Sequence, residues 1–267
     1  MSNKEFTKMS DTELAAKLGK YQRAARLWTI VGLIGVVAGL ICAFAVSDPV
    51  LKSVLIAVLF FGGVCCALFL GGGAQKKLKA LMNAQLGDFF AAELENAFGS
   101  KGHSPELCID APFLKALNIL DNEWEELEQE GFREGMYRGV NFSVSNVRLN
   151  HVYERGMPQD GLETCRDMIF KGVVIRAKTR VGARLTPELT EQIRNLAGSI
   201  EGQILALGLE NGILSLALET DYGFASVASS VDLRDLDALR RSYKRSLEQM
   251  CRFLDLLFES TELFEAK

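Results

Sequence analysis

The chain has 267 residues, of which 48% are hydrophobic and 24% are charged, and its formal net charge is −4. That charge predicts no strong attraction to nucleic acid. The six cysteines form no CxxC pair and only two histidines accompany them, so neither a zinc site nor a disulfide framework is predicted. We therefore expect no metal, no cofactor and a reducing compartment for the bulk of the chain.

Residues 1–26 are followed by a segment without charge, LWTIVGLIGVVAGLICAFAV, which runs from Leu27 to Val46. A helix of that length covers about 30 Å, the thickness of the hydrocarbon core of a bilayer. Pro49 ends any continued helix, and a second uncharged segment runs from Val54 to Ala74. Two such segments predict a transmembrane helical hairpin over 27–74, since a soluble protein would need a very large core to bury them and the apolar region of a signal peptide is shorter.

Basic residues flank the two predicted spans on the same side. They are Lys17, Lys20, Arg23 and Arg26 before the first span, and Lys76, Lys77 and Lys79 after the second. The turn between the spans carries only Asp48 and Lys52. The positive-inside rule then predicts cytoplasmic N- and C-termini in a bacterial inner (plasma) membrane, with the three lysines at the membrane interface.

Two further features of the hairpin have competing interpretations. Gly35 and Gly39 form a GxxxG pattern, which either packs the two spans together or joins copies of the chain in a homo-oligomer. The stretch GGGAQKKLK that begins at Gly71 lacks the spacing of a Walker motif or a dinucleotide fingerprint. It therefore indicates a membrane exit and not a phosphate-binding loop.

After the hairpin we predict an amphipathic connecting helix over 75–100 and then a cytoplasmic α+β domain over 101–267. A helix is expected from Pro112 to about Leu120. A cluster of acidic residues follows, and we interpret it as the solvated face of a helix because no histidine lies near to complete a metal site. Its members are Glu123, Glu125, Glu126, Glu128 and Glu130.

The central part of this domain has strand and turn signals. GVNFSVSNVRLNHVYE and DMIFKGVVIRAKT predict neighbouring antiparallel strands, with a slip in the alternation at Ser145-Asn146 that indicates a bulge. Thr186 is expected to cap a helix that Gly198 ends. Asn211-Gly212 predicts a tight hairpin between two apolar runs. His151, with Arg148 nearby, is either a structural histidine or a general base.

A long helix is predicted from Val231 with Asp232 as its cap, and its apolar residues recur at near-heptad spacing. This helix either covers the sheet or forms a coiled-coil seam. A basic patch on it would contact lipid headgroups or a partner, or would pair with Asp235, Asp237 and Glu248. The patch consists of Arg240, Arg241, Lys244 and Arg245.

The two strand segments resemble a bacterial family catalogued as Domain of Unknown Function 3137. The matching positions are Gly139, Phe142 and Ser143 in the first strand, and Phe170, Lys171 and Gly172 in the second. The resemblance covers most of the chain. It implies a membrane-anchored cytoplasmic α+β domain and brings no catalytic residues.

The fold expected is α+β, with an N-terminal two-helix transmembrane hairpin, a mainly antiparallel sheet packed by helices and a long C-terminal helix. The function expected is that of an integral inner-membrane protein that presents a binding or scaffolding domain. Its expected partners are the lipid bilayer and either another protein or a second copy of the chain. The alternative is a membrane-tethered enzyme that uses scattered loop residues.

Overall fold

A computed structural model describes residues 9–45, 47–99, 105–119, 123–157, 161–220, 223–228, 230–259 and 262–264. The chain divides into two compact units. The first consists of Met1–Phe89 with Ser230–Arg240, and the second of Phe90–Ser229 with Arg241–Lys267. The helices α4 and α7 each contribute residues to both units.

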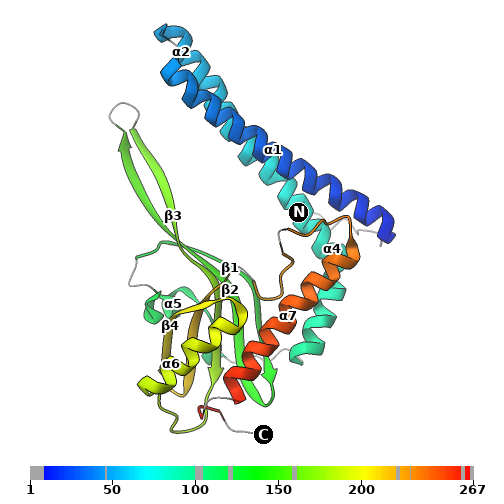
Figure 1. Cartoon of the computed structure of the whole chain (residues 1–267), viewed down its shortest axis with the longest axis vertical. Coiled ribbons are helices and arrows are strands. Elements are labelled where there is room, and N and C mark those ends of the chain that lie inside the picture. Colours follow the sequence, from blue (N-terminus) through cyan, green and yellow to red (C-terminus); the bar gives the residue numbers. More distant parts are fainter. Residues whose placement is uncertain are drawn as a thin grey trace. The chain divides into compact units, whose positions relative to one another are not determined.

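The first unit is built on two long helices (Figure 1). One is α1, Asp11–Ala45. The other runs without a break from Pro49 to Phe98 through α2 (Pro49–Ile56), a π-helical turn (Ala57–Phe61), α3 (Gly62–Cys65), a second π-helical turn (Cys66–Gly71) and α4 (Gly72–Phe98). Asp48 caps the second helix, since its carboxylate accepts hydrogen bonds from the backbone N–H groups of Val50 and Leu51.

The segment Ser230–Arg240 belongs to this helical unit although it is distant in sequence. The side-chain amide of Gln22 donates to the carbonyl of Val231 at 2.8 Å and accepts from the N–H of Leu233 at 3.1 Å. Gly19 leaves room for the aliphatic part of Arg234, because a Cβ at Gly19 would overlap it. One glutamine and one glycine on α1 therefore fix this segment.

The second unit is organised around one antiparallel sheet of five strands in the order β1-β2-β3-β5-β4 (Figure 1). Its elements in chain order are a 3-10 turn (Pro105–Leu107), α5 (Ala111–Leu117), β1 (Glu126–Tyr137), β2 (Val140–Met157), β3 (Gly161–Lys178), α6 (Pro187–Leu196), a 3-10 turn (Ala197–Ile200), β4 (Gln203–Glu210), β5 (Ile213–Glu219) and α7 (Leu236–Glu259). The predicted α+β class, with a C-terminal helix, is confirmed.

Three of the five acidic residues, Glu126, Glu128 and Glu130, lie in a strand and not in a helix, so that prediction was wrong, and Glu123 and Glu125 lie just before the strand. Glu126 to Tyr137 form β1, which pairs with β2 on both sides of a bulge between Glu130 and Arg133. Charged residues at alternate positions fit a strand with one solvated face as well as they fit a helix surface. Pairing with β2 makes this segment a strand, and the residues of the acidic segment alone do not indicate that pairing.

The bulge lies beside the predicted place but in the other strand. The register of β1 against β2 shifts between Glu130 and Arg133, and Gly131 has a φ of 67° there. The apolar pattern of β2 changes phase at Ser145-Asn146 because β2 is buried on both faces. Phe142 packs on Phe98 with ring centroids 5.3 Å apart, whereas Leu149 belongs to a core cluster with Leu114 of α5.

Other predicted boundaries are corrected or confirmed by local hydrogen bonds. Helix α7 begins at Leu236 and not at Val231, because the Asp235 carboxylate accepts from the N–H of Ala238 whereas Asp232 holds the preceding turn. Thr186 caps α6 as predicted, but the chain continues past Gly198 as a 3-10 turn. The hairpin at Asn211-Gly212 is confirmed, with φ values of 52° and 72°.

Candidate functional site: the apolar helical hairpin

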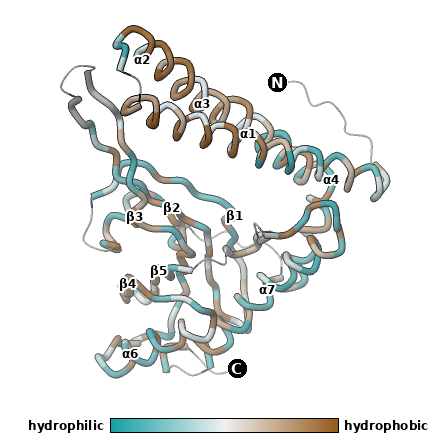
Figure 2. Tube along the Cα trace, turned by 45° about the horizontal axis from the view of Figure 1, so that its top comes forward, coloured by the Kyte–Doolittle hydropathy of each residue, from teal (hydrophilic) through white to brown (hydrophobic). Residues whose placement is uncertain are grey.

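The two long helices are hydrophobic over most of their length between α2 and the start of α4 (Figure 2), and many of their large apolar side chains are exposed. Leu33 is 63% exposed, Phe44 90% and Phe69 75%. Similar exposure recurs along both helices from Leu27 to Leu70. Both helices are long and apolar enough to cross a membrane. An apolar surface of this extent marks a site of interaction with lipid or protein.

The inner surface of the hairpin is made of small residues. A Cβ added at Gly35 would stand 2.9 Å from the carbonyl oxygen of Leu59, and one at Gly39 would stand 3.0 Å from Phe60. Gly32 and Gly63 approach each other equally closely, since a Cβ on either would be 2.6 Å from the carbonyl oxygen of the other. These glycines let the two helices of one chain pack backbone to backbone.

Basic residues from both helices lie at the same end of the hairpin. Gly71 lies beside the turn of α1 that contains Ala25 and Thr29. Arg26 belongs to that turn, and Lys76 follows Gly71 by five residues, which is about 7.5 Å along a helix. Lys76, Lys77 and Lys79 are all exposed. The other end of the hairpin has Asp48 and Lys52 as its charged residues.

The basic residues of α7 take part in several ion pairs. Arg240 contacts Asp11 at 3.1 Å and Asp237 at 3.4 Å, and its guanidinium lies 6.0 Å from the ring centroid of Phe89. Lys244 contacts Glu93 at 2.9 Å. Arg241 and Arg245 are exposed. Arg240 and Lys244 thus bind carboxylates of other helices.

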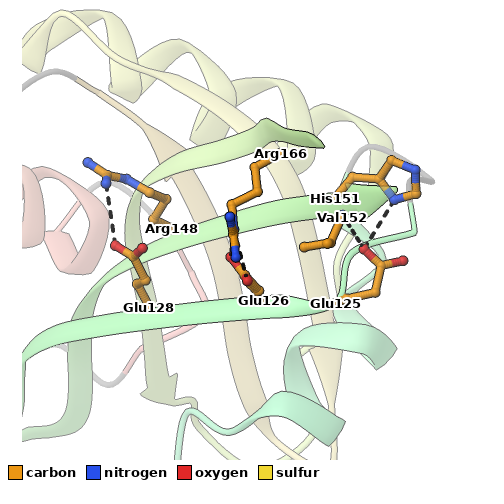
Figure 3. A network of polar contacts seen from close by, with 7 residues as sticks. All are labelled: Glu125, Glu126, Glu128, Arg148, His151, Val152 and Arg166. Carbon is orange, nitrogen blue, oxygen red and sulfur yellow. Dashed lines mark hydrogen bonds and ion pairs between the residues drawn. The ribbon is translucent and has the colours of Figure 1, made fainter. Parts of the chain in front are cut away.

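Glu126 and Glu128 of the acidic cluster belong to a ladder of ion pairs across the sheet (Figure 3). Glu128 of β1 contacts Arg148 of β2 at 3.3 Å, and both carboxylate oxygens of Glu126 lie 3.0 Å from Nε of Arg166 on β3. These side chains are 39–59% exposed. Pairs of this kind contribute about 0–1 kcal/mol each.

His151 belongs to the same ladder. Glu125 accepts a hydrogen bond from the backbone N–H of Val152 at 2.6 Å and lies 3.2 Å from Nδ1 of His151. The imidazole also stacks on Tyr153. A histidine held by a carboxylate on an exposed strand fits a structural role. No cluster of three or more His, Cys, Asp or Glu side chains suited to a metal ion occurs in the described part of the chain, and His103 lies outside it.

A depression of about 490 Å³ opens between α6 and the start of β4. It is lined by Arg194, Asn195, Gly198, Gly202, Gln203, Ile204 and Leu205. Arg194 contacts Glu191 at 3.4 Å. The lining therefore offers one cation with a carboxylate beside it, and none of its side chains is a nucleophile or a general base near neutral pH.

Two polar contacts that hold the second unit together were not predicted. The buried Arg133 donates to the carbonyl oxygen of Gly99 at 2.5 Å, just after the end of α4, where a cation is favourable. Tyr137 donates to Asp255 of α7 at 2.7 Å, and Arg138 contacts the same carboxylate at 2.8 Å. Burial, reinforced by the Asp255 hydrogen bond, raises the pKa of Tyr137. Sequence reasoning missed both because their partners lie 34 and 118 positions away along the chain.

No family model matches this chain, and no curated protein or solved structure matches it either. The resemblance to Domain of Unknown Function 3137 stays a prediction.

Proposed function

We propose that the chain is an integral protein of a bacterial inner membrane, anchored by the hairpin of α1 and the Pro49–Phe98 helix, with both termini in the cytoplasm. The observation that carries the proposal is the outward-facing apolar surface from Leu27 to Leu70. Exposure of this apolar surface to water is unfavourable in free energy, whereas the hydrocarbon core of a bilayer solvates it. Between Leu27 and Ala45 the helix covers about 28 Å, which matches the thickness of a bilayer core.

The orientation is supported by the basic end of the hairpin. Arg23, Arg26 and the three lysines after Gly71 gather there, whereas Asp48 and Lys52 offset each other at the tip. Basic residues close to spans stay on the cytoplasmic side during insertion. In this orientation the sheet unit is cytoplasmic, and Lys76, Lys77 and Lys79 lie at the headgroups.

The sheet unit serves, in this proposal, as a binding or scaffolding module. Its support is a buried core beneath a surface of paired charges, and, among the described residues, no cluster suited to a metal ion and no nucleophile in the lining of the depression beside α6. The exposed Arg241 and Arg245 of α7 are the candidates for contact with a lipid headgroup or a partner. Nothing in the described residues favours the alternative of a membrane-tethered enzyme.

Alkaline carbonate extraction of membranes from cells that express the full chain tests the anchoring. An integral protein stays in the membrane pellet, whereas release into the supernatant would reject the proposal. Cross-linking followed by affinity purification from detergent tests the binding role. Recovery of neither a specific protein nor a second copy would count against a scaffolding module.

A further inference from the structure

Six basic residues form a collar at the end of the hairpin where both helices leave the apolar surface. All six are exposed, and Arg26 directly precedes Leu27, the first residue of the uncharged segment of α1. The only acidic residue between Leu14 and Gly87 is Asp48, which lies at the opposite end of the hairpin. The members of the collar are Lys20, Arg23 and Arg26 of α1, and Lys76, Lys77 and Lys79 of α4.

The packing of the two helices sets the depth of the collar. A Cβ at Gly39 would lie 3.0 Å from Phe60, and one at Gly71 would lie 3.7 Å from the carbonyl oxygen of Ala25. The helices therefore run antiparallel, and Lys79, the collar residue farthest along α4, lies about 12 Å beyond Gly71. The headgroup layer of a bilayer is about 5–7 Å thick, and long basic side chains extend toward it. The whole collar is within reach of headgroups when the apolar surface lies in hydrocarbon.

The collar has few carboxylates beside it. Three of its lysines form no ion pair with any residue that the structure describes, and these are Lys20, Lys76 and Lys77. The segment Ser230–Arg240, which packs on α1 in the same unit, contributes Asp232. Arg23 interacts electrostatically with Asp232, but Nε of Arg234 already lies 2.9 Å from both oxygens of that carboxylate. The collar therefore keeps an excess of positive charge.

We propose that the collar binds anionic phospholipids of the cytoplasmic leaflet through their phosphate groups, and so enriches these lipids around the hairpin. The inference rests on the proposed membrane insertion and adds the class of lipid that surrounds one end of the hairpin. A basic cluster directly beside a membrane span is complementary to the negative surface of that leaflet. The positive-inside rule explains which end of the hairpin is basic, whereas bound lipid explains how its charge is neutralised.

An anionic lipid fits this surface better than a soluble anion does. Leu27 and Ile30 are 57% and 56% exposed, and Arg26 adjoins Leu27 in the chain. An occupant must therefore present negative charge and hydrocarbon next to each other. A phospholipid has both in one molecule, whereas a nucleic acid or an acidic protein segment would leave the apolar side chains in water.

Trp28 reports on the lipids at this end, because it lies two residues from Arg26 and is partly exposed. The full chain is reconstituted in vesicles of equal parts phosphatidylglycerol and phosphatidylcholine, with brominated acyl chains on one lipid or the other. Bromine quenches an indole only near contact, and the second tryptophan, Trp124, is 7% exposed in the core of the sheet unit. We expect brominated phosphatidylglycerol to quench more, with a preference of about fivefold, since one basic residue near an anionic surface contributes about that factor.

A charge-matched pair of variants tests whether the collar causes the preference. Lys76→Gln with Lys77→Gln should bring the quenching by the two lipids close to equality. Lys52→Gln with Lys171→Gln removes the same charge outside the collar and should leave the preference intact. If the collar variant does not reconstitute, the wild type is measured in about 1 M salt, where screening acts within about 3 Å and the preference should be lost.

The outcomes separate this proposal from the one on which it rests. Equal quenching of the wild type by the two lipids would overturn lipid selection and leave membrane insertion standing. A preference that survives both the loss of Lys76 and Lys77 and high salt would also overturn the role of the collar. Quenching by neither lipid would reject insertion of the hairpin and, with it, the binding of lipid by the collar.

Discussion

The helical hairpin and the sheet unit place their apolar side chains in opposite ways. In the hairpin, Leu33 and Phe69 face outward and Gly32 and Gly63 face inward. In the sheet unit, Phe142 and Phe170 are buried while charged pairs cover the exposed surface of the sheet. Both arrangements hide apolar groups from water if the hairpin is surrounded by lipid. In our proposal the two regions share the same packing rules and differ in the solvent that surrounds them.

Charges placed on the outer surface of the hairpin should have the largest effect, because they oppose its insertion into lipid. Leu33→Asp combined with Val58→Asp puts two carboxylates where side chains are 63% and 65% exposed. Each aspartate costs about 3 kcal/mol at the centre of a bilayer span. We expect loss of the chain from the membrane fraction on immunoblots.

The matched control uses exposed apolar residues of the sheet unit. Phe132→Asp with Met136→Asp should leave the chain in the membrane fraction, because both positions face water in our account. If the hairpin variant also stays in the membrane, the outer surface of the hairpin does not contact lipid.

Removal of one phenyl ring from each region should change the stability of the sheet unit in one case only. Phe170 is 1% exposed, and Phe170→Ala should destabilise the sheet unit by about 3–5 kcal/mol. Phe69→Ala, at a position that is 75% exposed, should leave the sheet unit unchanged. Urea unfolding of the full chain in detergent, followed by the fluorescence of Trp124, measures this because Trp124 lies in the same cluster as Phe170. Equal midpoints for the two variants would contradict the contrast.

Two adjacent glycines, Gly62 and Gly63, provide a test of helix packing inside the hairpin. A Cβ at Gly63 would meet the backbone of α1, whereas one at Gly62 would meet no atom within 4 Å. Gly63→Val should therefore cost about 1–3 kcal/mol by overpacking and separate the helices, while Gly62→Val should not. Spin labels on exposed Ile41 and Val54 would report a longer, broader distance distribution for the first variant alone. The same distance in both would reject the packing described for these glycines.

High pH should weaken the sheet unit through its buried tyrosines. Burial, with Glu93 nearby, raises the pKa of Tyr243 from 10.0 to about 12. As the pH rises, the Tyr243 phenol therefore loses its proton at a lower pH in the unfolded chain than in the folded chain. The contribution of the neutral phenol to the free energy of unfolding is fully present below pH 10 and is lost as the pH rises toward 12. Linkage gives about 1.4 kcal/mol per pH unit for one tyrosine. Urea titrations at pH 9, 10 and 11 should show a shallower decline for Tyr243→Phe, and parallel declines would contradict this assignment.

Much of the architecture could be predicted because its signals are local. The uncharged helices, the Thr186 cap and the Asn211-Gly212 turn each depend on a few neighbouring residues. The acidic segment could not be assigned in this way, since Glu126 and Glu128 become strand residues through pairing with β2. The start of α7 was misplaced because Asp232 and Asp235 are both plausible caps, and Gln22 holds the intervening backbone.

The candidate site was predictable only in part for the same reason. Exposed apolar helices and basic flanks can be recognised from composition. By contrast, Arg133 at the end of α4 and Tyr137 on Asp255 depend on contacts between residues 34 and 118 positions apart. Long-range partners of this kind leave no spacing pattern in one sequence.

The most direct test of the central claim is the sidedness of the hairpin tip. In a background without cysteine, Ser47→Cys and Ser10→Cys are labelled with a membrane-impermeant maleimide in spheroplasts. The account predicts that position 47 reacts in intact spheroplasts and that position 10 reacts only after lysis. Labelling of position 47 only after lysis, or of position 10 before it, would contradict a two-span hairpin with cytoplasmic termini.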